Sequence, residues 1–274
     1  MTLLFDRIGY WSEIKHAIIR EYASAYSKIL STRRNPTLHH VYIDAFAGPG
    51  QHFSKDKQEF VPGSPLIALA IDPPFKEYYL IDTDTEKVAE LKRITQEKDN
   101  LHILEGDCNE KLLEEVFPKI QYKDYKRGLC LLDPYGLHLD WRVIYTAGQM
   151  KSIDMFLNFP VADINRNVLW KNPQYVDPAD IIRMNSFWGD DSWRDISYGI
   201  TDMFGEKHKS DNDTIASAFG ERLNKVAGFS YVSDPLPMRN SKNAVVYYLF
   251  FASQKKVADN IIIDIFTKYK NKHS

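Results

Sequence analysis

Between residues 38 and 160 the chain repeats one unit: an apolar run, a turn, and a segment with helical spacing. The apolar runs lie within "LHHVYID", "EYYLID", "LHILEG", "RGLCLLD" and "SIDMFLNFP". They lack the alternation of a half-exposed strand, which is typical of strands that helices cover on both faces. Because crossovers between parallel strands are right-handed, the repeat predicts an α/β fold with a doubly wound, mostly parallel, Rossmann-like sheet.

The segments outside this repeat predict a helix, an insertion and a hairpin. Residues 10–30 have helical spacing of apolar side chains. Residues 161–214 are rich in Trp, Asn and Asp, so we expect a helical insertion without strands there. Two β-rich runs, "FSYVSDPLPM" and "NAVVYYLFFAS", predict an antiparallel hairpin that closes the sheet. We therefore expect one α/β domain from residues 1–160 and 215–274, with the insertion serving target recognition or partner binding.

Composition narrows the class of protein. Lys and Arg total 35 against 37 Asp and Glu, a net charge of -2, so any attraction to nucleic acid must come from a local basic face. Cys108 and Cys130 are too few for a disulfide framework or a zinc site, and we expect both to be reduced. The start does not resemble a signal peptide, and no run approaches the ~18 apolar residues of a membrane span. We expect a cytoplasmic protein that does not enter a membrane.

Each predicted strand leaves a carboxylate or carboxamide at its C-terminal end, where open α/β sheets bind ligands. Neighbouring carboxylates repel one another, so this edge favours a ligand with amines, hydroxyls and positive charge. S-adenosylmethionine has an amino group, a sulfonium, ribose hydroxyls and an adenine amine. The side chains in question are Asp44, Asp82 and Asp84, Asp107, Asp133 and Asn158.

Two other ligands fit the strand ends less well. NAD is disfavoured because "DAFAGPG" continues with Gln51 to Phe53, which breaks the G-x-G-x-x-G spacing. The next helix begins only near Ser64, so no helix N-terminus follows the turn to bind a pyrophosphate. A nuclease metal site is disfavoured because strands ~4.8 Å apart spread the carboxylates along the edge. We predict no bound metal.

Six motifs in order, "DAFAGPG", "GSPLIAL", "YLIDTD", "GDCNE", "LLDPYGL" and "NFP", resemble the three-Cys-motif partner (TcmP) proteins. That family is similar to class I S-adenosylmethionine-dependent methyltransferases and is typically encoded beside a radical-type protein with three cysteines. The resemblance covers residues 10–160. It implies that the first motif holds the methionine end, that Asp82 or Asp84 binds the ribose, and that "GDC" binds the adenine. The cofactor contacts so implied are Asp44, Ala47, Gly48, Gly50, Asp82, Asp84, Asp107 and Cys108.

The fourth motif is similar to the acceptor loop of methyltransferases that modify amino groups of bases. Those enzymes use Asp/Asn-Pro-Pro-Tyr/Phe, whereas this chain has Asp133, Pro134 and Tyr135, with one proline missing and the ring one position early. The resemblance implies methyl transfer to an amino group in nucleic acid, with Asn158 and Arg166 contacting the substrate. The alternative is a non-catalytic partner of a three-Cys-motif protein, which the altered loop and the near-zero net charge favour.

Two further segments each have two interpretations. "QHFSKDKQEFVP" is polar and long for a strand–helix connection, which suits either a lid over the cofactor or a plain surface loop. "FWGDDSW" contains Trp188 and Trp193, which either stack on a nucleic-acid target or anchor a small helical subdomain.

Overall fold

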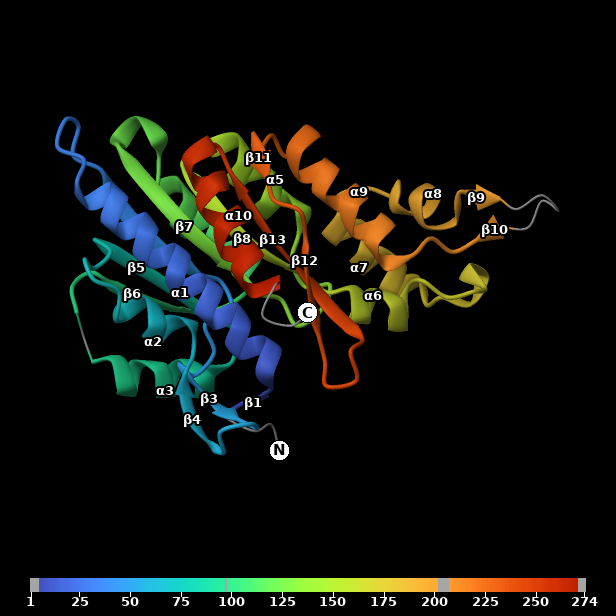
Figure 1. The fold of residues 1–274 in the computed structure, drawn as a ribbon, viewed down its shortest axis with the longest axis horizontal. Helices are drawn as coiled ribbons and strands as arrows, with labels where there is room; N and C mark the ends of the chain where they lie inside the picture. Colours follow the sequence, from blue (N-terminus) through green and yellow to red (C-terminus); the bar gives the residue numbers. More distant parts are fainter. Residues whose placement is uncertain (1–4, 97, 202–206, 271–274) are drawn as a thin grey trace.

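The computed structural model describes residues 5–96, 98–201 and 207–270. Its central sheet has five neighbouring parallel strands, and the C-terminal strands pair antiparallel at one side (Figure 1). The fold is therefore the mixed α/β architecture that the sequence predicts. Along the sheet the strands are β6 (Leu101–Glu105), β5 (Glu77–Asp82), β2 (His39–Asp44), β7 (Lys126–Leu132), β8 (Ile153–Phe159), β13 (Val245–Ser253) and β11 (Tyr231–Val232), and β12 (Leu236–Arg239) also pairs with β13.

Both faces of the sheet are buried, as the apolar strand sequences require. In β2, Val41 and Ile43 join one core cluster and Tyr42 joins the other, and none of the three is exposed. One face is covered by α1 (Tyr10–Ser31), α2 (Ser64–Leu69), α3 (Thr85–Thr95) and α10 (Lys256–Lys270). Figure 1 shows α1 and α10 side by side in front of the sheet.

The opposite face is covered by shorter helical pieces and by two longer helices. The shorter pieces follow β6 and lead into β7. The helices of this face are α4 (Cys108–Glu110), η1 (Lys111–Val116), η2 (Phe117–Lys119), η3 (Tyr122–Asp124), α5 (Trp141–Met150) and α9 (Asn212–Lys225).

Residues 51–62 form a β-hairpin, so the expectation of a loop there is wrong. β3 (Gln51–Ser54) pairs antiparallel with β4 (Glu59–Pro62), and β1 (Arg7–Ile8) adds a third strand parallel to β3. Phe53 and Phe60 contact each other with ring centroids 5.6 Å apart. These two rings give the otherwise polar segment an apolar contact on which to fold.

The segment after β8 is mostly helical. It contains α6 (Val161–Asn167), η4 (Pro173–Tyr175), α7 (Pro178–Trp188) and α8 (Trp193–Tyr198). The expectation that it lacks strands is wrong, because β9 (Ile200–Thr201) and β10 (Lys207–His208) form an antiparallel pair. The predicted boundary at residue 214 falls inside α9, whose N-cap Asp211 accepts a hydrogen bond from the Thr214 amide at 2.7 Å.

Trp188 and Trp193 are structural anchors of this segment. Their exposed fractions are 0% and 2%, and each indole N–H donates to a neighbouring side chain, Ser192 Oγ at 3.0 Å and Asn185 Oδ1 at 2.7 Å. The interpretation of these tryptophans as stacking platforms is therefore wrong, since neither ring is accessible to a ligand.

Within the three described ranges, no helix combines the length and the apolar character needed to cross a bilayer.

Candidate active site at the carboxyl ends of the strands

The parallel strands end at one edge of the sheet, and a cavity opens there. β2 has β5 on one side and β7 on the other, so the order of strands reverses at β2. Ligands of open α/β sheets bind at such a switch point. The cavity measures about 940 Å³ and lies among the first half of α1, the turn after β2, the loop after β7, α6 and the β12–β13 hairpin.

The turn after β2 has the backbone conformation that its glycines permit. Gly48 and Gly50 have φ angles of +62° and +84°, in the left-handed region that favours glycine. A Cβ at Gly50 would lie only 2.7 Å from a methyl carbon of Ile94. The turn is fixed to the neighbouring strand, because the Ala47 amide donates to the Ile81 carbonyl at 2.8 Å and the Gly48 amide to Asp82 Oδ2 at 2.8 Å.

Asp44 is completely buried where β2 ends. Its carboxyl accepts from the Phe46 amide at 3.3 Å and from the Ser64 hydroxyl. Gly63 is the N-cap of α2, and Ser64 is the first residue of that helix. Burial raises the pKa of Asp44 to about 7, although the hydrogen bonds from Ser64 and Phe46 oppose that change. Asp44 thus changes its charge near neutral pH and can respond to a cationic ligand.

Asp82 and Asp84 have different tasks. Asp82 accepts from two backbone amides, Gly48 at 2.8 Å and Asp84 at 2.9 Å. Asp84 is the N-cap of α3 and accepts from the amides of Glu86 and Lys87 at 2.9 and 3.1 Å. Asp82 thus uses both carboxylate oxygens to fix the turn, whereas Asp84 caps the helix through Oδ1 alone.

Asp107 and Cys108 follow β6 at the start of α4. Asp107 Oδ1 accepts from the amides of Asn109 and Glu110 at 2.9 and 3.2 Å, so one of its oxygens caps the helical turn. Cys108 is 4% exposed, and burial raises the pKa of its thiol to about 12. Cys108 is therefore an apolar neighbour at this edge and not a nucleophile.

The loop after β7 is held by side chains from the N-terminal part of the chain. Lys15 of α1 contacts the Asp133 carboxylate, and the Tyr135 hydroxyl donates to Asp6. Lys87 lies 3.5 Å from Asp6 Oδ2 and 5.5 Å from the centre of the Tyr135 ring. Tyr135 is 73% exposed. The loop thus presents a carboxylate and an accessible ring at the cavity.

Lys15 keeps its positive charge although it is buried. Burial by itself lowers the pKa of Lys15, but Asp133, Tyr247 and Asp44 raise it by more, so the pKa lies above the usual value. The Lys15 ammonium also lies 5.4 Å from the centre of the Tyr247 ring. The site therefore contains a fixed cation beside the Asp133 carboxylate.

Three buried polar atoms in the cavity wall have no hydrogen-bond partner among the described residues. They are Oδ1 of Asn158, whose residue is only 7% exposed, Nδ1 of His52 and the hydroxyl oxygen of Tyr247. Burial lowers the pKa of His52 and, more strongly, that of His16, whose ring stacks on it with centroids 5.6 Å apart. Buried polar atoms usually have partners, so these three atoms mark where a ligand would bond.

The cavity wall brings together part of the predicted set. Six predicted residues line it: Gly48, Asp133, Pro134, Tyr135, Asn158 and Arg166. The others lie outside the cavity lining, in or beside the strand ends and turns: Asp44, Ala47, Gly50, Asp82, Asp84, Asp107 and Cys108.

His52, Ser64 and Tyr247 also line the cavity, and no motif or spacing marks them as site residues in advance. Lys15 had one signal, since a lysine stands in the helical stripe that Trp11, Ile18 and Tyr22 form. A charged residue on the buried face of a helix needs a partner, and here the partner is Asp133.

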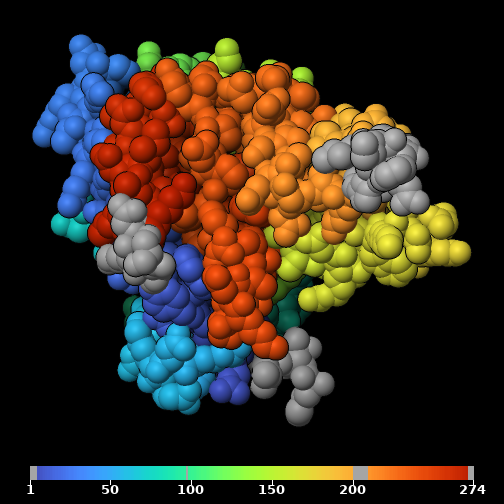
Figure 2. All heavy atoms as spheres, turned by 45° about the vertical axis from the view of Figure 1, so that its right-hand side comes forward, coloured from blue at the N-terminus to red at the C-terminus, as the bar shows by residue number. Residues whose placement is uncertain are grey.

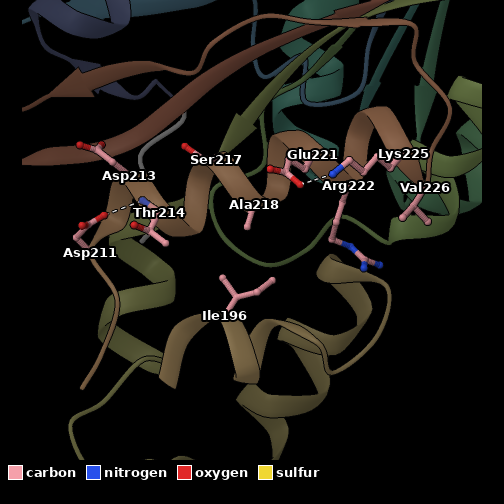
Figure 3. Close-up of a pocket in the computed structure, with 10 residues that line it drawn as sticks. All are labelled: Ile196, Asp211, Asp213, Thr214, Ser217, Ala218, Glu221, Arg222, Lys225 and Val226. Carbon is pink, nitrogen blue, oxygen red and sulfur yellow. Dashed lines mark hydrogen bonds and ion pairs between the residues drawn. The ribbon is translucent and has the colours of Figure 1, made fainter. Parts of the chain in front are cut away.

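A second, more open hollow of about 640 Å³ lies between α8 and α9 (Figure 3). Its charged groups are engaged within the protein: Lys225 with Glu221 at 2.7 Å, Asp211 with the Thr214 amide, Arg222 with Asp190 at 2.9 Å, and Asp213 with the Tyr248 hydroxyl. Unlike the strand-end cavity, it contains no buried polar atom that lacks a partner among the described residues. Across the described ranges, no three His, Cys, Asp or Glu side chains gather closely enough to hold a metal ion.

Comparison with known proteins gives matches of fold and none of sequence. No family model and no curated protein matches the chain. Protein LPL1258 from Legionella pneumophila is 12% identical with a TM-score of 0.55, covering 95% of this chain and 92% of its own. The methyltransferase domain of bacterial CtHen1-CN is 9% identical, with a TM-score of 0.42 and coverage of 86% and 99%. A putative S-adenosylmethionine-dependent methyltransferase from Listeria monocytogenes is 12% identical, with a TM-score of 0.42 and coverage of 86% and 99%.

At these identities the likeness concerns the fold alone. The Legionella protein shares it over nearly the whole chain, in agreement with the doubly wound sheet. The other two neighbours are methyltransferases by title, and their likeness is looser.

Proposed function

We propose that the protein is an S-adenosylmethionine-dependent methyltransferase that acts on an amino group in nucleic acid. One observation carries the proposal: a left-handed glycine turn, a buried carboxyl and an acceptor-type loop meet at the switch point of a doubly wound sheet. The chemistry that S-adenosylmethionine supplies when bound is an electrophilic methyl group on a sulfonium.

The cofactor end of the site fits that ligand. Gly48 lines the cavity and would let a ligand approach the backbone, Gly50 brings the turn close to Ile94 of α3, and Ala47 is the small residue between the turn and β5. Asp44 is buried behind Ser64, which lines the cavity, so its carboxylate would hold the cationic amine through the loop, and a neighbouring cation would favour its ionised form. Asp82 would accept the ribose hydroxyls. In this proposal Asp107 binds the adenine amine and Cys108 lies against the ring.

The acceptor end would align a neutral amine. The Asp133 carboxylate and the Pro134 carbonyl would accept hydrogen bonds from it, and the accessible Tyr135 ring would stack on the base. Asn158 Oδ1 would be a further acceptor, and Arg166 at the cavity wall would contact a phosphate. The methylated nitrogen releases a proton, for which the Asp133 carboxylate is the acceptor within reach.

The Lys15 charge narrows the choice of acceptor. A fixed ammonium beside Asp133 repels an alkylammonium such as a protein lysine, whereas an exocyclic base amine is neutral. This supports a nucleobase over a protein amine as the acceptor.

A non-catalytic partner of a three-Cys-motif protein is the second candidate. The observation in its favour is that the acceptor loop is engaged within the chain, Asp133 with Lys15 and Tyr135 with Asp6. In that case the strand ends serve as a scaffold, and no methyl group is transferred.

Methyl-labelled S-adenosylmethionine separates the two candidates. The purified protein is incubated with the label and with RNA or DNA, which is then digested and its nucleosides analysed. We expect a labelled amino-methyl nucleoside. Asp133→Ala should abolish the label and retain cofactor binding, whereas Asp44→Ala should abolish both. Absence of label from every nucleic acid, together with co-purification of the three-Cys-motif protein, would favour the scaffold.

A further inference from the structure

We propose that the exposed rings of Trp170 and Tyr175, with Arg166 and Lys171, form a binding surface for an unpaired nucleic-acid strand beside the acceptor cavity. We call these four residues the strand surface. The inference deepens the proposed function and rests on it, because it assigns the part of the substrate that lies outside the cavity.

The strand surface is continuous with the cavity wall. Arg166 lines the cavity from the last turn of α6, and the Trp170 indole N–H donates to the Arg166 carbonyl at 2.7 Å. The Trp170 ring is therefore fixed close to Arg166, which lines the cavity of the proposed acceptor. Figure 2 shows the yellow lobe that contains these residues extending from the body next to the orange β12–β13 hairpin, whose residues line the same cavity.

Trp170 is held in place although its ring is accessible. Its carbonyl accepts from the Tyr198 hydroxyl at 2.8 Å and its indole N–H is bonded as above, while the residue remains 42% exposed. Tyr175, in η4, is 70% exposed. The same lobe buries Trp188 and Trp193 completely, so its stability does not require these two outer rings to pack.

The charge of the strand surface is positive. Arg166 and Lys171 are exposed on it. The acids nearby are engaged: Asp180 and Asp163 both bond to Arg183, at 2.7 and 3.4 Å, and Asp177 caps α7 through the Ala179 amide. Accessible aromatic rings beside basic side chains are the arrangement that binds unpaired strands, through base stacking and phosphate contact.

The cavity itself requires an unpaired nucleotide. An exocyclic amine inside a duplex is stacked and paired, so an enzyme must take the base out of the helix or accept a single strand. Stacking platforms on the path out of the cavity would hold the neighbouring bases of such a strand. A duplex offers these rings no free base faces.

The test is fluorescence anisotropy with labelled single-stranded RNA, single-stranded DNA of the same sequence, and the matching duplex, all without cofactor. We expect a single strand to bind more tightly than the duplex. Trp170→Ala and Tyr175→Ala should each weaken binding about fivefold to 150-fold. Arg166→Gln should reduce the slope of log affinity against log salt by about 1. Tyr145→Ala, on α5, is the matched control because Tyr145 is 45% exposed and lies away from the cavity lining.

Preference for RNA over DNA, or the reverse, identifies the type of strand and supports the surface in either case. Unchanged affinity of both ring variants, or tighter binding of the duplex, overturns it. Calorimetry with S-adenosylmethionine on the same samples separates this failure from that of the proposed function. Cofactor binding without strand binding overturns the strand surface alone, and strand binding without cofactor binding overturns the methyltransferase assignment alone.

Discussion

Lys15 and Asp133, separated by 118 residues in the sequence, contact each other side chain to side chain at the carboxyl end of β7. The Lys15 side chain is 8% exposed and that of Asp133 is 25% exposed. This ion pair connects the first helix to the loop that we propose to hold the acceptor. It allows the acceptor end of the site to be tested separately from the cofactor turn.

Lys15→Met should destabilise the fold because it leaves the Asp133 carboxylate half-buried without its partner. Breaking a fully buried pair costs about 3–5 kcal/mol, and since Asp133 keeps some contact with water we expect a loss of about 2 kcal/mol in the free energy of unfolding. Urea denaturation measures this loss. Adding Asp133→Asn removes the charge and should restore part of it. Effects of the two substitutions that simply add would contradict a stabilising pair.

Asp44 should make stability depend on pH. Its pKa rises from 3.8 to about 7 in the folded protein, so between about pH 4 and pH 7 the native state holds a proton that the unfolded state has released. The contribution of Asp44 to the free energy of unfolding should therefore fall as pH rises through this window and level off above pH 7.

Asp44→Asn removes that dependence and provides the control. Burial also raises the pKa of Asp154 to about 6 and lowers those of His16 and His52, so the variant keeps a pH dependence of its own, and the difference between the two curves isolates the contribution of Asp44. Thermal unfolding at a series of pH values measures both curves. Identical curves for the variant and the parent protein would show that Asp44 is ionised throughout.

Substitution of Asp82 should weaken cofactor binding, whereas substitution of Asp84 should weaken the capping of α3. Asp82→Ala removes the carboxylate that we propose accepts the ribose hydroxyls, and a hydrogen bond to a charged group is worth about 1.5–3 kcal/mol, so S-adenosylmethionine should bind at least about tenfold more weakly. Asp84→Ala should lower the free energy of unfolding by about 1 kcal/mol through loss of the N-cap and leave cofactor affinity unchanged. Calorimetry and urea denaturation of both variants measure these effects. The reverse pattern would assign the ribose to Asp84.

Asn158 should support methyl transfer at some cost to the stability of the fold. Asn158→Leu removes a buried acceptor that lacks a partner, so we expect the free energy of unfolding to rise by about 1 kcal/mol while methyl transfer falls about tenfold or more. Ser197→Ala is the matched control, because Ser197 Oγ is also buried without a partner but lies outside the cavity lining. It should change stability in the same direction and leave transfer intact. A destabilised Leu variant with full transfer would remove Asn158 from the site.

The fold was predictable because its signals are local. Apolar runs without alternation define the strands of residues 39–159, and parallel strands necessarily bring their C-terminal residues to one edge. Asp44, Asp82 and Asp133 follow from that rule alone. The glycine turn was predictable because two glycines, Gly48 and Gly50, follow the strand closely, and glycine is the residue that favours positive φ angles.

Contacts across long sequence separations were not predictable. The hairpin of β3 and β4 pairs with β1, whose two residues carry no strand signal of their own. Lys15 meets Asp133 only once α1 has packed over the sheet. The exposure of individual tryptophans was not predictable either. Nothing in "FWGDDSW" indicates that both of its tryptophans are buried, and nothing around Trp170 indicates that its ring is partly exposed.

The central claim is that the strand ends bind S-adenosylmethionine, and calorimetric titration of the purified protein tests it most directly. The titration is run in metal-free buffer with S-adenosylmethionine and with S-adenosylhomocysteine, and repeated with Asp44→Ala. We predict saturable binding of both ligands with micromolar dissociation constants, a free energy of about −8 kcal/mol, and its loss in the variant. Absence of binding for both ligands, or equal affinity in Asp44→Ala, would contradict the account.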